Sequence, residues 1–386
     1  MLKAILSATV VVSLAHTAAS AGDSLRIIPF RETSGAIIID ANINGTVCPM
    51  LFDTGATMCL SPAMWDSLHL NETSTSQSFT DSRGSHVNSY TAPMPSFTLG
   101  GTVYSNLSAM RLDIPSIPGF SCYGISGVAG PEIIGGKVCT IDFQAHTLTL
   151  ADSLDTPLAP GSVSVPMTRR YNDQPWLWLS VGGDSLLCSF DTGSNSTLKL
   201  SRQATESLLD TCAYRYTEYG YTATGGGGYG SADTLVSIKT AGAVSAASMP
   251  LGDVPAIVHS KPTNIMGTRL MRHYRITLNY PASTIIFTPV VADGSEPECP
   301  FAATLGYSSG NIIIASVRTA PGCSQPPVST GTKVTAVNGH RLPSTASPAI
   351  LCDVLSSVSQ SRAMRLRVID DNGRERKVKI HRLRIK

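Results

Sequence analysis

Residues 48–61 read CPMLFDTGATMCLS, and residues 187–201 read LCSFDTGSNSTLKLS. In each stretch an apolar run leads into Asp-Thr-Gly, and a second run of β-forming residues then ends at a serine. Ser61 and Ser201 precede the helix-like segments PAMWDSLHL and RQATESLLD, so each is a predicted N-cap, with Pro62 at a first helical position. The same strand, loop and helix pattern therefore occurs twice.

A second pair of motifs follows each Asp-Thr-Gly at a matching distance. Two apolar residues precede a glycine in Val-Ala-Gly and again in Ile-Met-Gly. Asp53 and Gly130 are 77 residues apart, and Asp191 and Gly267 are 76 residues apart. Two motifs at offsets that differ by one residue predict an internal duplication, in which most elements are short strands separated by Gly, Pro and Ser.

The composition narrows the class of protein. The 386 residues include 42% hydrophobic and 15% charged side chains, with a net charge of +2. This length predicts two or three domains, and the ordinary hydrophobic content excludes a disordered chain. Near-neutral charge disfavours a nucleic-acid partner. No CxxC or HExxH motif is present, so we expect neither a metal site nor a cofactor.

The first 21 residues have the pattern of a secretion signal. Lys3 is followed by an apolar run from Ala4 to Ala15, and Ala19-Ser20-Ala21 is a small-residue cleavage site. The apolar run is too short to cross a bilayer, and no later stretch is long enough either. We therefore expect a secreted or periplasmic protein, cleaved after Ala21 and without a membrane span.

Nine cysteines in an oxidising compartment predict disulfides, although an odd number leaves at least one thiol unpaired. Cys299 and Cys323 flank one segment near the C-terminus and are the best candidates for a pair. Cys48, Cys59 and Cys188 lie in apolar surroundings, where buried thiols and bridges are equally plausible.

The two aspartates suggest a shared chemical site. An Asp at the end of an apolar strand is costly to bury unless it is hydrogen-bonded or shares a proton. Two related halves packed about a pseudo-twofold axis bring Asp53 and Asp191 face to face. Such a pair titrates as a unit, and it can hold a water, take its proton and protonate the carbonyl or leaving amine of a peptide.

The residues that flank the aspartates suit this task. Gly55 and Gly193 allow a tight turn and offer N–H groups to the carboxylates. Thr54 and Thr192 are placed to bond across the axis and brace the two loops.

The fourth loop position differs between the two halves. Ser194 can donate a hydrogen bond to Asp191, whereas Ala56 cannot do so for Asp53. A hydrogen bond to the charged form favours ionisation, so we expect Asp191 to carry the charge more readily.

The motifs resemble those of the retropepsin-like aspartic proteases, in which each lobe supplies one Asp from an apolar-apolar-Asp-Thr-Gly-Ala/Ser loop. The apolar-apolar-Gly motifs and the strands TIDF and TLNY after them also resemble this family. The resemblance covers roughly residues 25–290 and implies an all-β fold of two barrel lobes, as in pepsin-like enzymes. It further implies hydrolysis of peptide or protein substrates by Asp53 and Asp191.

The implied lobes span residues 22–153 and 154–292, and because both lie in one chain we expect a monomer. Members of the family close hairpin flaps over the substrate, and the candidates are residues 81–90 and 219–230, with Tyr90 and Tyr229. The second candidate contains a GxGxxG match, but the segment after it is strand-like, so a glycine-rich hairpin is favoured over a dinucleotide-binding loop.

The remaining residues, 300–386, resemble a PDZ domain, with short strands around one amphipathic helix. Leu305-Gly306-Tyr307 lies where that family has its carboxylate-binding loop, although Thr332 replaces the family's usual Asp in a later segment. The resemblance implies an α/β module that binds peptide C-termini by strand addition, for substrate presentation or regulation. Its helix is predicted from apolar residues at helical spacing, namely Ile350, Leu351, Val354 and Leu355.

Two alternatives to a secreted aspartic endopeptidase remain at this point. One is a non-catalytic peptide-binding or scaffold protein that retains the protease fold. The other is a serine hydrolase, because residues 306–310 match G-x-S-x-G around Ser308. That motif needs a helix after the serine, whereas the segment NIIIASV predicts a strand.

Overall fold

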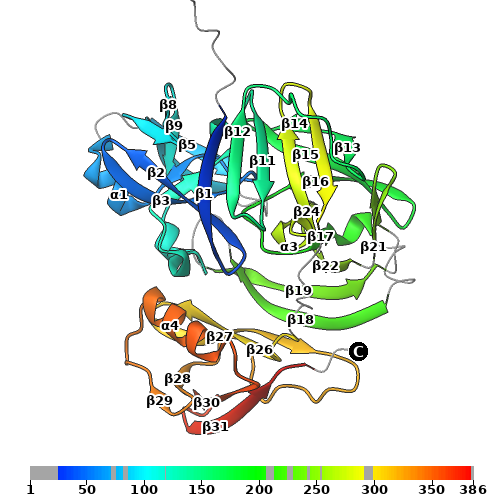
Figure 1. Cartoon of the computed structure of the whole chain (residues 1–386). Coiled ribbons are helices and arrows are strands. Elements are labelled where there is room, and N and C mark those ends of the chain that lie inside the picture. Colours follow the sequence, from blue (N-terminus) through cyan, green and yellow to red (C-terminus); the bar gives the residue numbers. More distant parts are fainter. Residues whose placement is uncertain are drawn as a thin grey trace, which may run out of the picture.

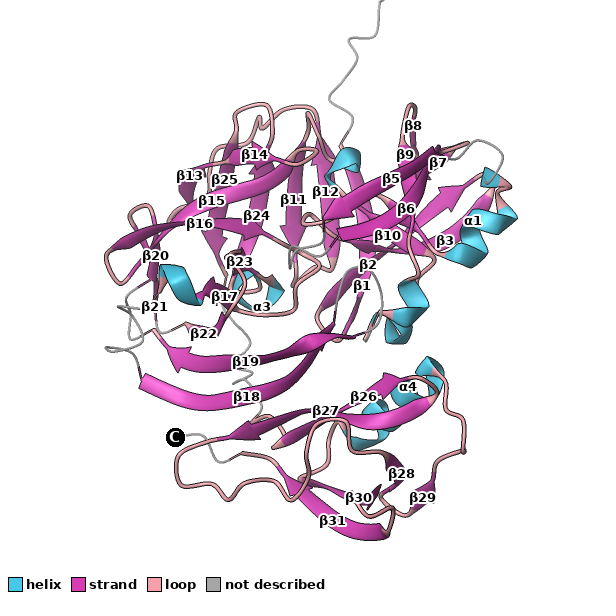
Figure 2. Cartoon of the chain, turned by 180° about the vertical axis from the view of Figure 1, so that it is seen from behind, coloured by secondary structure: helices cyan, strands magenta, loops and turns pink. Residues whose placement is uncertain are grey.

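The computed structural model of the chain describes residues 25–70, 75–80, 86–117, 119–205, 213–223, 229–240, 244–252, 254–290 and 299–383. The predicted secretion signal and its cleavage point lie outside these residues. Strands make up most of the described part, and its helices are short, so the prediction of a mainly β protein is confirmed (Figures 1 and 2). Within these ranges, no helix has the length and apolar character needed to cross a membrane.

The larger sheet combines strands from both motif regions. Its path, in order of pairing, is β13 (Val163–Pro166), β25 (Thr284–Pro289), β24 (Tyr274–Asn279), β11 (Val138–Asp142), β12 (Thr147–Ala151), β1 (Arg26–Thr33), β2 (Ala36–Ile43), β3 (Thr46–Phe52), β10 (Gly127–Ala129), β4 (Cys59–Leu60), β9 (Ser108–Arg111), β6 (His86–Pro93) and β5 (Thr75–Thr80). β7 (Phe97–Leu99) pairs with β2 and with β8 (Thr102–Tyr104). β11 and β24 are antiparallel neighbours, with Thr140 opposite Thr277, so this sheet joins the two halves.

The second sheet carries the second motif region and continues into the C-terminal module. Its path is β21 (Met249–Gly252), β20 (Val244–Ala246), β15 (Gln174–Val181), β16 (Asp184–Phe190), β23 (Ile265–Met266), β17 (Leu198–Ser201), β22 (Pro255–His259), β19 (Tyr229–Lys239), β18 (Ala213–Ala223), β27 (Asn311–Thr319) and β26 (Ala303–Ser308), with β14 (Thr168–Arg170) beside β15.

The two motif regions pair their strands in the same way. β10 lies parallel to β3 and antiparallel to β4, and β23 lies parallel to β16 and antiparallel to β17. β3 and β16 have neighbours on both edges, and their last three residues are all buried, so both faces of the sheet are covered there. Each Asp-Thr-Gly loop therefore leaves the end of a buried interior strand.

The helices that follow the motifs differ. Ser61 caps α1 (Pro62–Ser67) as predicted, and its hydroxyl accepts the N–H of Met64 at 3.3 Å. After the second motif the chain forms the 3-10 turn η5 (Arg202–Ala204), and Ser201 precedes it without a side-chain capping bond. The prediction for Ser201 is wrong, and the rest of that expected helix, residues 206–212, lies outside the described residues.

Two hairpins lie where the resemblance implies flaps. β5 pairs with β6, and β18 pairs with β19, while residues 81–85 and 224–228 between them lie outside the described residues. Tyr90 on β6 is half exposed, and the side chain of Tyr229 is outside the described set. The GxGxxG match leads into strand β19 rather than a helix, which argues against a dinucleotide-binding loop.

The C-terminal module has its own core. Its four-stranded sheet has the order β29 (His340–Arg341), β28 (Val334–Val337), β30 (Ala363–Ile369) and β31 (Glu375–His381), and helix α4 (Pro348–Val358) packs beside it. Leu351, Val354 and Val358 form the buried face of α4, which confirms the predicted helix. Ser308 ends β26 and strand β27 follows after a turn, so the serine-hydrolase elbow is not formed.

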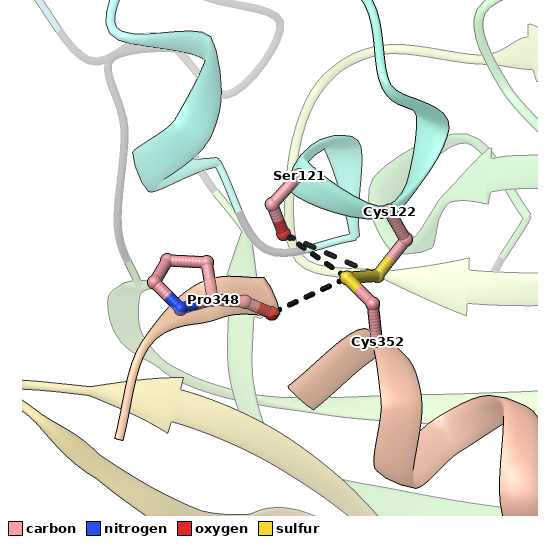
Figure 3. The surroundings of a disulfide bond; sticks show 4 residues. All are labelled: Ser121, Cys122, Pro348 and Cys352. Carbon is pink, nitrogen blue, oxygen red and sulfur yellow. Dashed lines mark hydrogen bonds between the residues drawn. A yellow bond between two sulfur atoms is a disulfide. The ribbon is translucent and has the colours of Figure 1, made fainter. Parts of the chain in front are cut away.

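Two connections tie this module to the rest of the chain. β27 pairs with β18 of the second hairpin, and at this junction Arg318 Nε lies 2.9 Å from Glu218 Oε2. A disulfide joins Cys122, in the turn η3 (Phe120–Tyr123), to Cys352 in α4 (Figure 3). Cys299 and Cys323 are not joined by a disulfide, so their predicted pairing is wrong. The three cysteines in apolar surroundings, Cys48, Cys59 and Cys188, are buried thiols.

Candidate active site

The two Asp-Thr-Gly loops meet with their carboxyl groups in hydrogen-bonding contact. Asp53 follows β3, Asp191 follows β16, and the two side chains bond to each other. Each carboxyl group also lies against the glycine of the opposite loop. A Cβ at Gly55 would lie 2.6 Å from Asp191 Cγ, and one at Gly193 would overlap the Asp53 carboxyl. Only glycine fits at these two positions without moving an aspartate.

Each carboxylate is also held by its own loop. The N–H of Gly55 donates to Asp53 Oδ1 at 2.8 Å, and the N–H of Gly193 donates to Asp191 Oδ1 at 2.9 Å. These bonds have the same geometry in both loops, as expected from the matching sequences. They orient the two carboxyl groups toward each other.

Reciprocal hydrogen bonds between the two threonines lock the loops together. Thr54 N–H donates to Thr192 Oγ1 at 2.9 Å, and Thr192 N–H donates to Thr54 Oγ1 at 3.1 Å. Each hydroxyl then donates across the junction, Thr54 to Phe190 O at 2.6 Å and Thr192 to Phe52 O at 2.8 Å. Both threonines are fully buried, so four buried backbone groups depend on two side chains.

Each half also contacts the other half's loop through a hairpin turn. Asn195, just after the second Asp-Thr-Gly-Ser, donates to the carbonyl of Ser34 in the β1–β2 turn at 3.3 Å. Asn172, in the β14–β15 turn, donates to Thr57 Oγ1 behind the first loop at 3.3 Å. The exchange is reciprocal, so each loop is contacted by a turn of the other half.

The two aspartates do not titrate alike. Burial raises the pKa of Asp53 well above its usual range, and the neighbouring charge of Asp191 raises it further. Burial also raises the pKa of Asp191, but Lys199 and hydrogen bonds from the Asp53 side chain and backbone N–H groups oppose this shift. These opposing influences favour the proton on Asp53 and the charge on Asp191.

Asp191 was expected to carry the charge more readily than Asp53, and the directions of the two pKa shifts agree with this. The predicted cause, a hydrogen bond from Ser194 to Asp191, is wrong. The hydroxyl of Ser194 pairs with Ser196 Oγ at 2.8 Å instead of donating to Asp191. The positive charge comes from Lys199 on β17, which pairs with β23. Lys199 lies opposite Ile265 of β23, and the equivalent residue in the first half, opposite Val128 of β10, is the uncharged Cys59.

Sequence reasoning missed three residues at this site: Lys199, Glu132 and Gln174. Gln174 Nε2 donates to the carbonyl of Gly55 at 2.8 Å, and Glu132 Oε1 accepts the N–H of Met58 at 3.1 Å. Lys199 follows the second Asp-Thr-Gly motif and Glu132 follows the Val-Ala-Gly motif, so their closeness to these motifs could have identified them as residues of the site. Gln174 is 119 residues from its partner, and no local pattern indicates that contact.

The residues predicted for peptide binding lie in the C-terminal module. Leu305 and Gly306 are buried in β26, and Tyr307 is partly exposed. β26 is the last strand of its sheet path, and α4 contacts it. In the described part of the chain, no three His, Cys, Asp or Glu side chains gather as metal ligands do.

The comparisons with known proteins agree with this arrangement over part of the chain. The aspartyl protease family model matches residues 39–132, a segment that includes the first Asp-Thr-Gly loop and Gly130. A search of curated proteins found no match. Over the matched segment the chain therefore has an aspartyl protease-like domain.

Proposed function

We propose that the protein is an aspartic endopeptidase that uses Asp53 and Asp191 to activate a water molecule. The observation that carries this proposal is the contact between the two carboxyl groups, one favouring the proton and the other the charge. The family match over the first loop supports it.

The division of charge assigns a role to each aspartate. Asp191, as the carboxylate, takes a proton from the water while the water oxygen attacks the peptide carbonyl carbon. Asp53 gives its proton to the carbonyl oxygen, which yields a neutral tetrahedral diol. Proton transfer to the amide nitrogen then breaks the C–N bond, and the products are a carboxylic acid and an amine. The proton shared by the pair is restored in each cycle.

The two halves, residues 22–153 and 154–292, form the two lobes of this enzyme and are related by a pseudo-twofold axis. The equal strand pairing around the two loops supports this assignment, as do the reciprocal threonine bonds. The hairpins β5–β6 and β18–β19 act as flaps over the substrate.

Residues 300–386 act as a PDZ-like module that binds the C-terminal end of a peptide. The position of β26 at the edge of its sheet, with α4 beside it, supports this role because an edge strand can accept an added strand. The enzyme works outside the cytoplasm, as a secreted or periplasmic monomer. The Cys122–Cys352 disulfide supports this location, since such bonds persist in oxidising compartments.

Digestion of a peptide library at pH 3 to 8 tests the proposal. The variants are Asp53→Asn and Asp191→Asn, with Asp155→Asn as an exposed control. We expect the parent and the control to cleave internal peptide bonds and both loop variants to lose this activity. Cleavage by either loop variant at the parent's rate contradicts the proposal. Peptide binding without cleavage at every pH identifies a non-catalytic scaffold instead.

A further inference from the structure

Glu132 lies directly behind the Asp53 loop, in the turn η4 (Pro131–Ile133). Its Oε1 accepts the N–H of Met58, five residues after Asp53. Its other oxygen, Oε2, is buried and has no hydrogen-bond partner among the described residues. A Cβ at Gly130 would overlap both this oxygen and the carbonyl oxygen of Ala56, so both oxygens border the same small space beside Gly130. An unpartnered buried carboxylate oxygen is costly and calls for an explanation.

The second half shows how the equivalent carbonyl is satisfied. Ser194 occupies the position of Ala56, and its carbonyl accepts the N–H of Thr268 at 2.8 Å and the hydroxyl of Thr268 at 3.2 Å. The position of Thr268 in the first half is taken by Pro131, which has neither an N–H nor a hydroxyl. The Ala56 carbonyl therefore lacks both donors that its counterpart has.

The surroundings of Glu132 favour its neutral form. Burial raises its pKa, and the charge of Asp173 raises it further, although the N–H groups of Met58 and of Glu132 itself act in the opposite direction. Asp173 itself pairs with Arg169 at 3.7 Å. Among the described residues, Cys59, Asp173 and Tyr280 interact electrostatically with this carboxyl, and Asp53 in turn acts on Cys59.

We propose that Glu132 is a positioning residue that braces the first Asp-Thr-Gly loop only while it is protonated. As the neutral acid it accepts from Met58 through Oε1 and donates its Oε2 proton to the Ala56 carbonyl. This bond replaces the support that Thr268 gives to the second loop. Loss of the proton places a carboxylate oxygen against a carbonyl oxygen and loosens the loop. The consequence for catalysis rests on the proposed function, whereas the consequence for stability does not.

The first test measures stability. Urea unfolding of the full chain is followed from pH 4 to pH 8 for the parent and for Glu132→Gln, whose amide keeps an acceptor and a permanent donor. A group with a raised pKa stabilises the fold below its ordinary value of 4.5, and this contribution is lost as the pH rises through the folded value. The unfolding constant of the parent should rise relative to the variant by up to about tenfold per pH unit in that window. If the ratio of the two unfolding constants, parent to Glu132→Gln, is the same at every pH from 4 to 8, the proposal is overturned.

A matched control is Glu375→Gln on β31, in the C-terminal module. The pKa of Glu375 is lowered by bonds from Thr335 and Arg367. The stabilising contribution of Glu375 is therefore lost only as the pH falls below its ordinary value of 4.5, so from pH 5 to 8 its replacement should leave the pH dependence of unfolding unchanged. The same change for both variants also overturns the proposal.

The second test measures peptide cleavage, with each kcat profile divided by its own value at pH 4. The alkaline limb should move to higher pH in Glu132→Gln. Glu132→Met, which can neither accept nor donate, should lose at least about tenfold in kcat at every pH with a smaller change in KM, because the loop positions a catalytic group. Superimposed profiles of the parent and Glu132→Gln contradict the brace. If no peptide is cleaved, the proposed function fails, and the unfolding test still decides the role of Glu132.

Discussion

Replacement of Thr54 by Val tests whether the threonine bridge holds the two loops together. Val has nearly the shape of Thr, so the substitution removes the hydroxyl with little change in packing. Two hydrogen bonds are lost, the one to Phe190 O at 2.6 Å and the one from Thr192 N–H at 3.1 Å. Both remaining backbone groups are buried in the parent, so each is left without a partner.

The expected destabilisation follows from these two groups. Leaving a buried donor or acceptor unsatisfied costs about 1–3 kcal/mol, so Thr54→Val should lower the free energy of unfolding by about 2–6 kcal/mol. Such a loss is a large part of the total stability of a typical domain. The loops should also shift, and a displacement of about 1 Å lowers catalytic rates by about 100-fold.

Urea unfolding and peptide cleavage measure the two effects. Thr140→Val is the matched control, because Thr140 also bonds across the two halves, hydroxyl to hydroxyl with Thr277 at 2.8 Å, without carrying a backbone group. It should cost about 1 kcal/mol or less. Thr54→Ser, which keeps the oxygen, should restore most of the stability. If Thr54→Val is no more harmful than Thr140→Val, the bridge does not support the loops and this reasoning is refuted.

Three further substitutions or treatments have defined outcomes. Gly193→Ala should abolish cleavage because its Cβ overlaps the Asp53 carboxyl, whereas Gly135→Ala, which meets only ordinary contacts, should cleave normally; equal activity contradicts the close loop contact. Lys199→Met should raise the pKa of Asp191 and therefore move the acid limb of the kcat profile to higher pH, whereas Lys199→Arg should leave the limb in place. If the limb does not move in Lys199→Met, the charge of Lys199 does not act on the two aspartates. Reduction of the disulfide, which joins positions 230 residues apart, should lower stability by about 5 kcal/mol on loop entropy, as measured by urea unfolding, and an unchanged midpoint contradicts this.

The contact between the two aspartates was predictable because duplication provides both the local loop and its partner. Once two equal loops are recognised, the bonds between Thr54 and Thr192 follow from symmetry. The departures from symmetry were harder to predict. The second motif is two residues longer between its Asp and its serine, and this extension supplies Ser196 as a partner for Ser194. That alternative partner is why the expected bond to Asp191 does not form.

The contacts around the loops depend on pairing between distant segments. Glu132 lies 74 residues from Met58, and no periodic pattern indicates their hydrogen bond. The same limit applies to the disulfide, for which proximity in sequence suggested Cys299 and Cys323. The bond actually joins a turn of the first half to a helix of the C-terminal module. Disulfide pairing depends on how the helices, turns and strands pack together, and the spacing of the cysteines along the chain carries no information on that packing.

The junction between the second hairpin and the C-terminal module was also absent from the predictions. The sequence predicts β27 as a strand, but it does not indicate that β27 pairs with β18 as well as with β26. That pairing depends on which strand edges remain unpaired once the second hairpin and the C-terminal module have folded. Glu218 and Arg318 face each other at this junction, although they are 100 residues apart. The sequence indicates the elements, whereas the final sheet order requires the assembled structure.

The affinity for a peptide with a tetrahedral hydroxyl group in place of the scissile amide is the most direct measure of whether Asp53 and Asp191 form a catalytic pair. A site built from one neutral and one charged carboxyl group should bind this mimic of the diol at least about 100-fold more tightly than the matched amide peptide. Calorimetry at pH 4 to 5 measures both affinities, for the parent and for Asp53→Asn. This preference should be present in the parent and lost in Asp53→Asn. Equal affinity of the parent for the two peptides would contradict the catalytic pair.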